Sequence, residues 1–138
     1  MRFVRLAAAL LLAGAVAVGC GNGDAEPEAT AEEKFCAAFR DYYERSEKNA
    51  GEKDAVIVAS MKEFAEEADG LTPPKSMSSD AKAGLQAWID LIADVPDDAS
   101  QAEVAELSQK LSPKQIEQLD AYYLYANARC LSAATPTS

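Results

Sequence analysis

Apolar residues recur at alternating spacings of three and four along most of the chain. This is the pattern of amphipathic helices that each bury one face. Glycine, proline and capping residues divide the pattern into five segments. No segment has the apolar-polar alternation of a half-buried strand. The sequence therefore predicts an all-α protein.

The first three predicted helices carry the longest core stripes. The first begins near Ala31, after a capping box of Thr30 and Glu33, and ends before Gly51. Gly70 ends the second, and Pro96 ends the third, which Ser78, Ser79 or Asp80 caps. The expected inward residues are Cys36, Phe39, Tyr43 and Ser46, flanked by Phe35 and Tyr42, in the first helix; Ile57, Met61, Phe64, Ala68 and Leu71 in the second; and Ala81, Leu85, Trp88, Ile92 and Val95 in the third.

Two further helices are predicted towards the carboxyl end. Ser100 and Glu103 form a capping box that opens a short helix, with Val104, Leu107 and Leu111 inward. Ser112 then caps the last helix, and Pro113 occupies its first position, where a missing N–H costs nothing. The expected core stripe of the last helix is Ile116, Leu119, Tyr123, Ala126 and Cys130.

The amino-terminal segment has the organisation of a secretory signal peptide. Arg2 and Arg5 precede an apolar run from about Leu6 to Val18, and small residues stand before Cys20. The run is shorter than the roughly 20 residues that a membrane-spanning helix needs. Residues 1–19 are therefore predicted to be a signal peptide. Residues 20–30, without a large apolar side chain, are predicted to be a flexible tether.

The cleavage region resembles that of small actinobacterial surface lipoproteins. The resemblance lies in the lipobox Ala17-Val18-Gly19-Cys20 and the following Gly21-Asn22-Gly23-Asp24, with one departure at Ala17, where leucine is more usual. It implies that the thiol of Cys20 receives a diacylglycerol, that the preceding peptide is removed, and that the new amino terminus is acylated, for example with palmitate. The protein would then be lipid-anchored on the extracytoplasmic face of the cell membrane.

Lipid accounts for one of the three cysteines, and the other two are expected to pair. A Cys36–Cys130 disulfide suits an exported chain, whereas redox-active pairs usually have Cys-x-x-Cys spacing. The bridge requires the first and last helices to be antiparallel neighbours. Five strictly alternating helices would make them parallel, so the short fourth helix is expected to cross the end. The predicted domain, residues 31–133, is a four-helix bundle with one additional short crossing helix, followed by a disordered tail, 134–138.

Charge and composition exclude several function classes. The chain has 23 acidic and 13 basic residues, a net charge of -10, and no histidine. Such acidity disfavours nucleic acid as a partner. Without histidine, Ser-His-Asp and Cys-His nucleophilic sites are excluded. The pairs Glu32-Glu33, Glu66-Glu67 and Asp97-Asp98 are expected to be solvated surface, and turn chemistry accounts for Asp94, Asp97 and Asp98 better than calcium binding. We expect no enzyme activity, cofactor or metal.

Tyrosines on the first and last helices are the one local surplus. Helical projection places Tyr123 in the core stripe, Tyr122 at its edge and Tyr125 near the opposite face. The candidate interaction surface is Tyr42, Tyr122, Leu124 and Tyr125. Two interpretations are open: the tyrosines pack between the two helices with their hydroxyls reaching water, or they form an aromatic recognition patch with Tyr125 and Leu124 as exposed anchors. The expected function is a non-enzymatic interaction module for an envelope or exported protein. The alternative is a binder of small apolar ligands near Trp88 and Tyr123.

Overall fold

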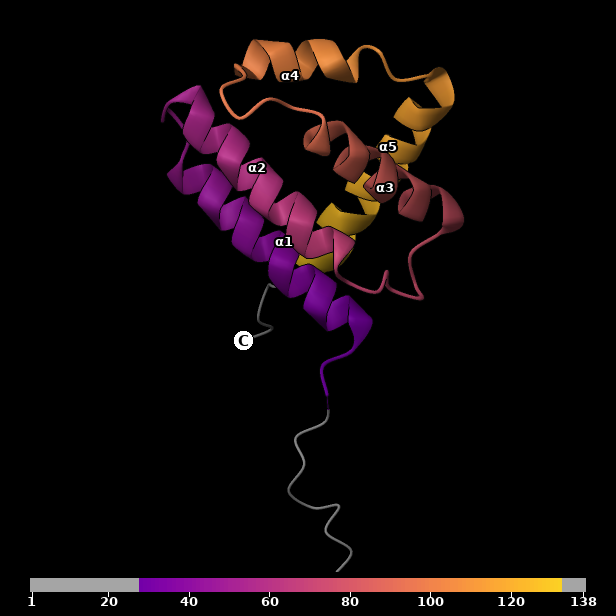
Figure 1. Ribbon diagram of the computed structural model, residues 1–138. Helices are drawn as coiled ribbons and strands as arrows, with labels where there is room; N and C mark the ends of the chain where they lie inside the picture. Colours follow the sequence, from indigo (N-terminus) through magenta and orange to yellow (C-terminus); the bar gives the residue numbers. More distant parts are fainter. Residues whose placement is uncertain (1–27, 133–138) are drawn as a thin grey trace, which may run out of the picture.

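Five α-helices and one π-helix form the part of the chain that the computed structural model describes, residues 28–132 (Figure 1). Residues in this range form no strand. The elements are α1 (Ala31–Lys48), α2 (Asp54–Asp69), α3 (Ser79–Ala93), α4 (Gln101–Ser108), α5 (Pro113–Ala126) and the π-helix η1 (Asn127–Leu131). The predicted signal peptide, Cys20, most of the tether and the tail lie outside the described residues. The all-α prediction is confirmed.

The helix starts follow the capping residues of the sequence. The Thr30 side chain accepts a hydrogen bond from the Glu33 amide, and the Glu33 carboxylate accepts one from the Thr30 amide. Ser100 with Glu103 and Ser112 with Gln115 form the same reciprocal pair. These bonds satisfy amides that have no partner inside the helix. Local sequence thus decides where α1, α4 and α5 begin.

The helices pack in a bundle-like arrangement. The chain reverses between α1 and α2 at Gly51, whose φ of 92° suits glycine, and the two helices lie side by side (Figure 1). α3 packs against α2 and also crosses α5. α3 and α5 are the most closely packed pair of helices in the described chain. α4 lies across the end where α2 begins, and Gln101 Nε2 donates a hydrogen bond to Asp54 there. The expected crossing orientation of the fourth helix is confirmed.

Aromatic rings fill the centre of the fold. The rings of Phe64 and Tyr42 stack with centroids 4.7 Å apart, and Trp88 lies 5.3 Å from Phe64. Phe39 packs edge-on against both Phe64 and Tyr122. All five inward residues expected for the third helix are buried: Ala81, Leu85, Trp88 and Ile92 in α3, and Val95 just after its end. Burial of such rings from four helices is the main apolar stabilisation of the domain.

The inward faces of α1 and α5 differ from the predicted ones. On α1, Tyr43 and Ser46 are exposed, and Phe35 and Tyr42 point inward. The reason is that α1 is covered on two sides, by α2 and by η1, so its buried face is broad and centred on Phe39. On α5, Ile116 and Tyr123 are exposed, and Tyr122 is only 1% exposed. Close packing of α5 against α3 buries the neighbouring face of α5, which carries Tyr122.

The Cys36–Cys130 disulfide joins α1 to η1 and is confirmed, with Cα atoms 4.8 Å apart. The π-helix contains more residues per turn than an α-helix. Ala126 and Cys130 are four residues apart, a spacing that places two residues on one face of a helix, and both are fully buried. Arg40 Nη1 donates a hydrogen bond of 3.2 Å to the Cys130 carbonyl. Sequence periodicity did not predict this change of helix type.

Candidate functional site

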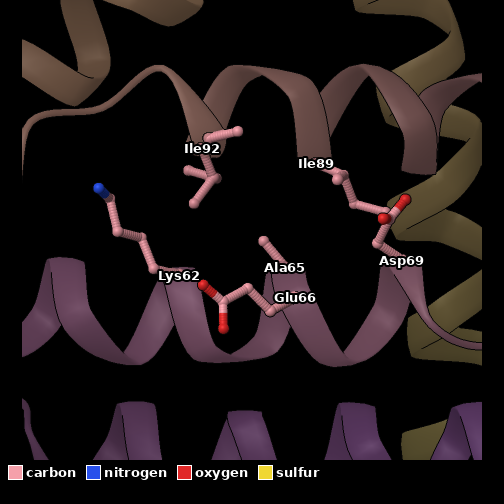
Figure 2. Close-up of a pocket in the computed structure, with 7 residues that line it drawn as sticks. Lys62, Ala65, Glu66, Asp69, Ile89 and Ile92 are labelled. Carbon is pink, nitrogen blue, oxygen red and sulfur yellow. The ribbon is translucent and has the colours of Figure 1, made fainter.

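A surface groove with a volume of about 260 Å³ runs between α2 and α3 (Figure 2). It is lined by Lys62, Ala65, Glu66 and Asp69 of α2 and by Ile89, Ile92 and Ala93 of α3. Figure 2 shows both isoleucines pointing from α3 towards α2, with Ala65 facing them. We call this feature the α2–α3 groove.

Small side chains give the α2–α3 groove its depth. Ala65 of α2 and Ala93 of α3 line the groove with side chains of a single carbon. Ile92 and Ile89 are buried beneath the opening and form an apolar floor. Because this floor consists of core residues, the helical packing that stabilises the domain also holds the floor in place.

The rim of the α2–α3 groove carries an acidic excess. Lys62 Nζ lies 2.5 Å from Asp97 Oδ1, so its charge is paired. Glu66 and Asp69 make no ion pair or side-chain hydrogen bond within residues 28–132. The unpaired charges around the apolar floor are therefore negative.

The hydrogen bond from Lys62 lowers the pKa of Asp97, and the positive charge of Lys62 acts in the same direction. The Asp97 side chain is almost fully exposed, so solvent screens this pair. Asp97 thus holds Lys62 at one end of the groove without forming part of a buried ionic site. Asp97 and Asp98 lie in a turn, as expected from the sequence.

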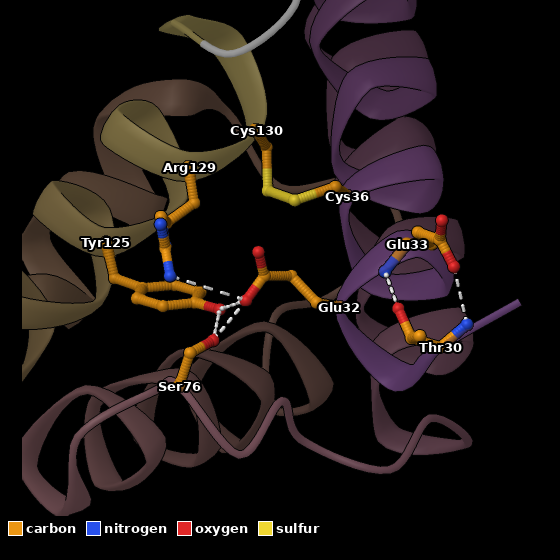
Figure 3. A network of polar contacts seen from close by, with 8 residues as sticks. All are labelled: Thr30, Glu32, Glu33, Cys36, Ser76, Tyr125, Arg129 and Cys130. Carbon is orange, nitrogen blue, oxygen red and sulfur yellow. Dashed lines mark hydrogen bonds and ion pairs between the residues drawn. A yellow bond between two sulfur atoms is a disulfide. The ribbon is translucent and has the colours of Figure 1, made fainter.

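A second polar site joins residues of α1, the α2–α3 connection, α5 and η1 beside the disulfide (Figure 3). The Glu32 carboxylate at the start of α1 accepts hydrogen bonds from Ser76, in the α2–α3 connection, and from the Tyr125 hydroxyl of α5 at 3.2 Å. Arg129 Nη2 of η1 lies 3.9 Å from the same carboxylate oxygen. The Ser76 and Tyr125 hydroxyl oxygens are 2.7 Å apart. We call these four residues the Glu32 cluster.

The electrostatics of the Glu32 cluster follow from these contacts. The Ser76 hydrogen bond lowers the pKa of Glu32, assisted by the Tyr125 hydroxyl and the Arg129 charge. Burial raises the pKa of Tyr125, and the nearby negative charge of Glu32 adds to the shift. The cluster therefore holds an ionised carboxylate among donors. Because its pKa is lowered, the Glu32 carboxylate is a poor general base near neutral pH.

The structure does not gather the four candidate surface residues on one face. Tyr122 is buried against Phe35 and Phe39, so its assignment to an exposed surface is wrong. Tyr42 is half-buried under Phe64, and Tyr125 is half-buried in the Glu32 cluster. Leu124 is 72% exposed. Phenylalanines of α1, and not its tyrosines, pack against the α5 tyrosines, so the expected seam of tyrosines between the two helices does not form.

Tyr123 has an exposed body and a desolvated hydroxyl end. The residue is 39% exposed, and its ring lies 5.1 Å from that of Tyr122. Desolvation raises the pKa of Tyr123 to about 12.

The region near Trp88, which was the alternative site for a small apolar ligand, is filled by the rings of Tyr42 and Phe64. A ligand there would have to displace packed aromatic side chains.

Two general results concern the described chain. Residues 28–132 contain no group of three or more acidic or cysteine side chains arranged to hold a metal ion. None of the described helices combines the length and the apolar character needed to cross a membrane.

No known protein family, curated protein or solved structure matches the chain. The fold and the groove define it as a disulfide-closed, all-helical domain.

Sequence reasoning missed the α2–α3 groove. Glu66 was assigned only to solvated surface, and Lys62, Asp69 and Ala93 were not singled out. A usable signal exists in α2, where Lys62, Glu66 and Asp69 at helical spacing share one face beside the small Ala65. Only the position of α3 shows that this face borders a hollow.

Proposed function

We propose that the protein is a non-enzymatic interaction module, anchored by lipid on the extracytoplasmic face of the cell membrane, that binds another protein of the envelope. The observation that carries the proposal is the α2–α3 groove, in which an apolar floor is bordered by the unpaired Glu66 and Asp69. Exposed carboxylates beside an apolar floor, held on a rigid helical scaffold, suit binding to another protein more than catalysis.

The anchoring part of the proposal rests on the lipobox that ends in Cys20. The tether enters the domain at Thr30, and the disulfide closes the same end through Cys36 and Cys130. Such closure would keep the domain folded outside the cytoplasm, where disulfides persist. A short tether would then hold the groove near the membrane surface.

Lipid anchoring is tested in a bacterial host that processes lipoproteins. Cells are fed an alkyne analogue of palmitate, and the protein is analysed for label and for its distribution between membrane and soluble fractions. Wild-type protein should be labelled and sediment with membranes, whereas Cys20→Ala should carry no label. Label on Cys20→Ala, or none on wild type, would contradict anchoring through Cys20.

Partner binding is tested on intact cells with a photo-crosslinking amino acid. The crosslinker replaces Ala93 in the groove or, as a matched control, Asp120 on the exposed side of α5. We expect a discrete adduct from position 93 and none from position 120. Absence of any adduct from several positions around the domain, with normal surface display, would contradict an interaction function.

A further inference from the structure

We infer that the α2–α3 groove docks a partner segment in which a lysine or arginine stands beside an aliphatic residue. The inference rests on the proposed interaction function and specifies the chemistry of the partner. It follows from the size of the groove, the apolar floor and the sign of the unpaired charges.

The size of the groove favours side chains over a free ligand. Its volume of about 260 Å³ lies below the roughly 300–1,000 Å³ of pockets that enclose small molecules. One or two side chains of a protein segment fit such a hollow. The rest of the segment would lie along the surface between the two helices.

The floor and rim together specify the two residue types. Ile89 and Ile92 offer an apolar surface that an aliphatic side chain can cover. Glu66 and Asp69 supply carboxylates without a cationic partner in residues 28–132. A lysine or arginine can lay its methylene stem on the floor and place its charge at this rim. An acidic or purely apolar segment would leave the carboxylates unpaired.

Charge complementarity extends beyond the groove. The chain carries a net charge of -10, so its field attracts cationic segments and repels nucleic acid and anionic lipid. Lys62 is the cation of the rim, and Asp97 already pairs with it. The local and the overall electrostatics therefore favour the same class of partner.

The test measures binding of defined peptides to the full-length protein in a neutral detergent. The probe is a fluorescein-labelled hexapeptide of alternating lysine and leucine, and the matched probes replace lysine by glutamate or leucine by serine. Fluorescence polarisation reports binding, and the signal with detergent alone is subtracted. We expect the lysine-leucine peptide to bind most tightly, with an affinity that falls as salt rises.

Two groove variants and one control decide whether binding occurs in the groove. Glu66→Gln/Asp69→Asn removes the rim charges, and Ala93→Gln fills the hollow at unchanged charge. Each should raise the Kd of the lysine-leucine peptide about fivefold or more. Glu117→Gln/Asp120→Asn makes the same chemical change on exposed α5 and should leave the Kd unchanged. Unchanged melting of all variants shows that folding is intact.

Four outcomes would overturn the inference. An equal loss of binding in the α5 control would show attraction by net charge alone. Full binding by both groove variants would place the peptide elsewhere. Self-association of wild-type protein that Ala93→Gln abolishes would make a second copy of this chain the occupant. Capture of a crosslinked partner through another face would contradict binding in the α2–α3 groove but would still support the interaction function. The two proposals can therefore fail independently.

Discussion

The backbone of Gly84 in α3 lies directly against the backbone carbonyl of Gln118 in α5. A Cβ atom at position 84 would be 1.9 Å from the Gln118 oxygen and 2.9 Å from the Leu119 nitrogen. Glycine permits this approach because it has no side chain. The contact lets α3 and α5 cross at very short range, and it places Tyr122, one turn after Gln118, in the core.

Gly84→Ala should therefore destabilise the domain by roughly 2 kcal/mol or more, because the two helix backbones must separate. Chemical denaturation monitored by circular dichroism measures the change. Gly70→Ala is the matched control: its Cβ would meet nothing closer than 3.5 Å, and the residue already has helical dihedral angles. That control should be neutral or slightly stabilising. Equal stability of the two variants would contradict the close contact.

Loss of the disulfide should lower the stability of the fold because it increases the conformational entropy of the unfolded chain. Cys36 and Cys130 are 94 residues apart, and closure of so long a loop contributes at most about 4–5 kcal/mol. We expect Cys36→Ser to lower the melting temperature by at least about 10 °C. Wild-type protein treated with reductant should melt at a similarly low temperature. A Cys36→Ser variant that melts at the same temperature as the oxidised wild type would contradict stabilisation by the disulfide.

The Glu32 cluster should make stability depend on pH. The folded-state pKa of Glu32 lies below its ordinary value of 4.5, so ionised Glu32 stabilises the fold. This contribution is complete above pH 4.5 and is lost as pH falls through the lower folded-state pKa. The stability difference between wild type and Glu32→Gln should thus shrink on acidification. Because Glu32 is 38% exposed, solvent screening keeps the effect modest.

The control for Glu32 is Glu67→Gln, on the exposed side of α2. Urea unfolding at a series of pH values from 3 to 7, on the order of one pH unit apart, measures both differences. A wild-type minus Glu32→Gln difference that stays constant across this series would contradict the role of the cluster.

Tyr122 and Leu124 should respond in opposite ways to truncation. Tyr122→Ala removes a buried ring that packs on Phe35 and Phe39, and it should cost roughly 3–5 kcal/mol. Leu124→Ala removes an exposed side chain and should change stability by no more than about 0.5 kcal/mol. Thermal melts compare the two variants. A large loss for Leu124→Ala would mean that this residue is covered in the protein.

Predictability from sequence differed between α3 and α5 for a physical reason. The stripe Ala81, Leu85, Trp88 and Ile92 of α3 was predicted correctly, although the buried Ile89 was left out of it. In α5, apolar residues stand on two overlapping faces, one with Tyr122 and one with Tyr123. Periodicity alone could not choose between them. The choice came from Gly84, which belongs to another helix.

The sequence by itself determined the helical class, the helix starts at Thr30, Ser100 and Ser112, and the pairing of Cys36 with Cys130. The helix starts depend on local hydrogen bonding, and the cysteine pairing follows from the sequence if Cys20 is set aside for lipid, as the lipobox resemblance implies. Only the tertiary structure decided that Tyr122 is buried, that Glu32 meets Tyr125, and that α2 and α3 leave a groove. These features depend on how closely separate helices approach, and that distance is set by side chains remote in sequence.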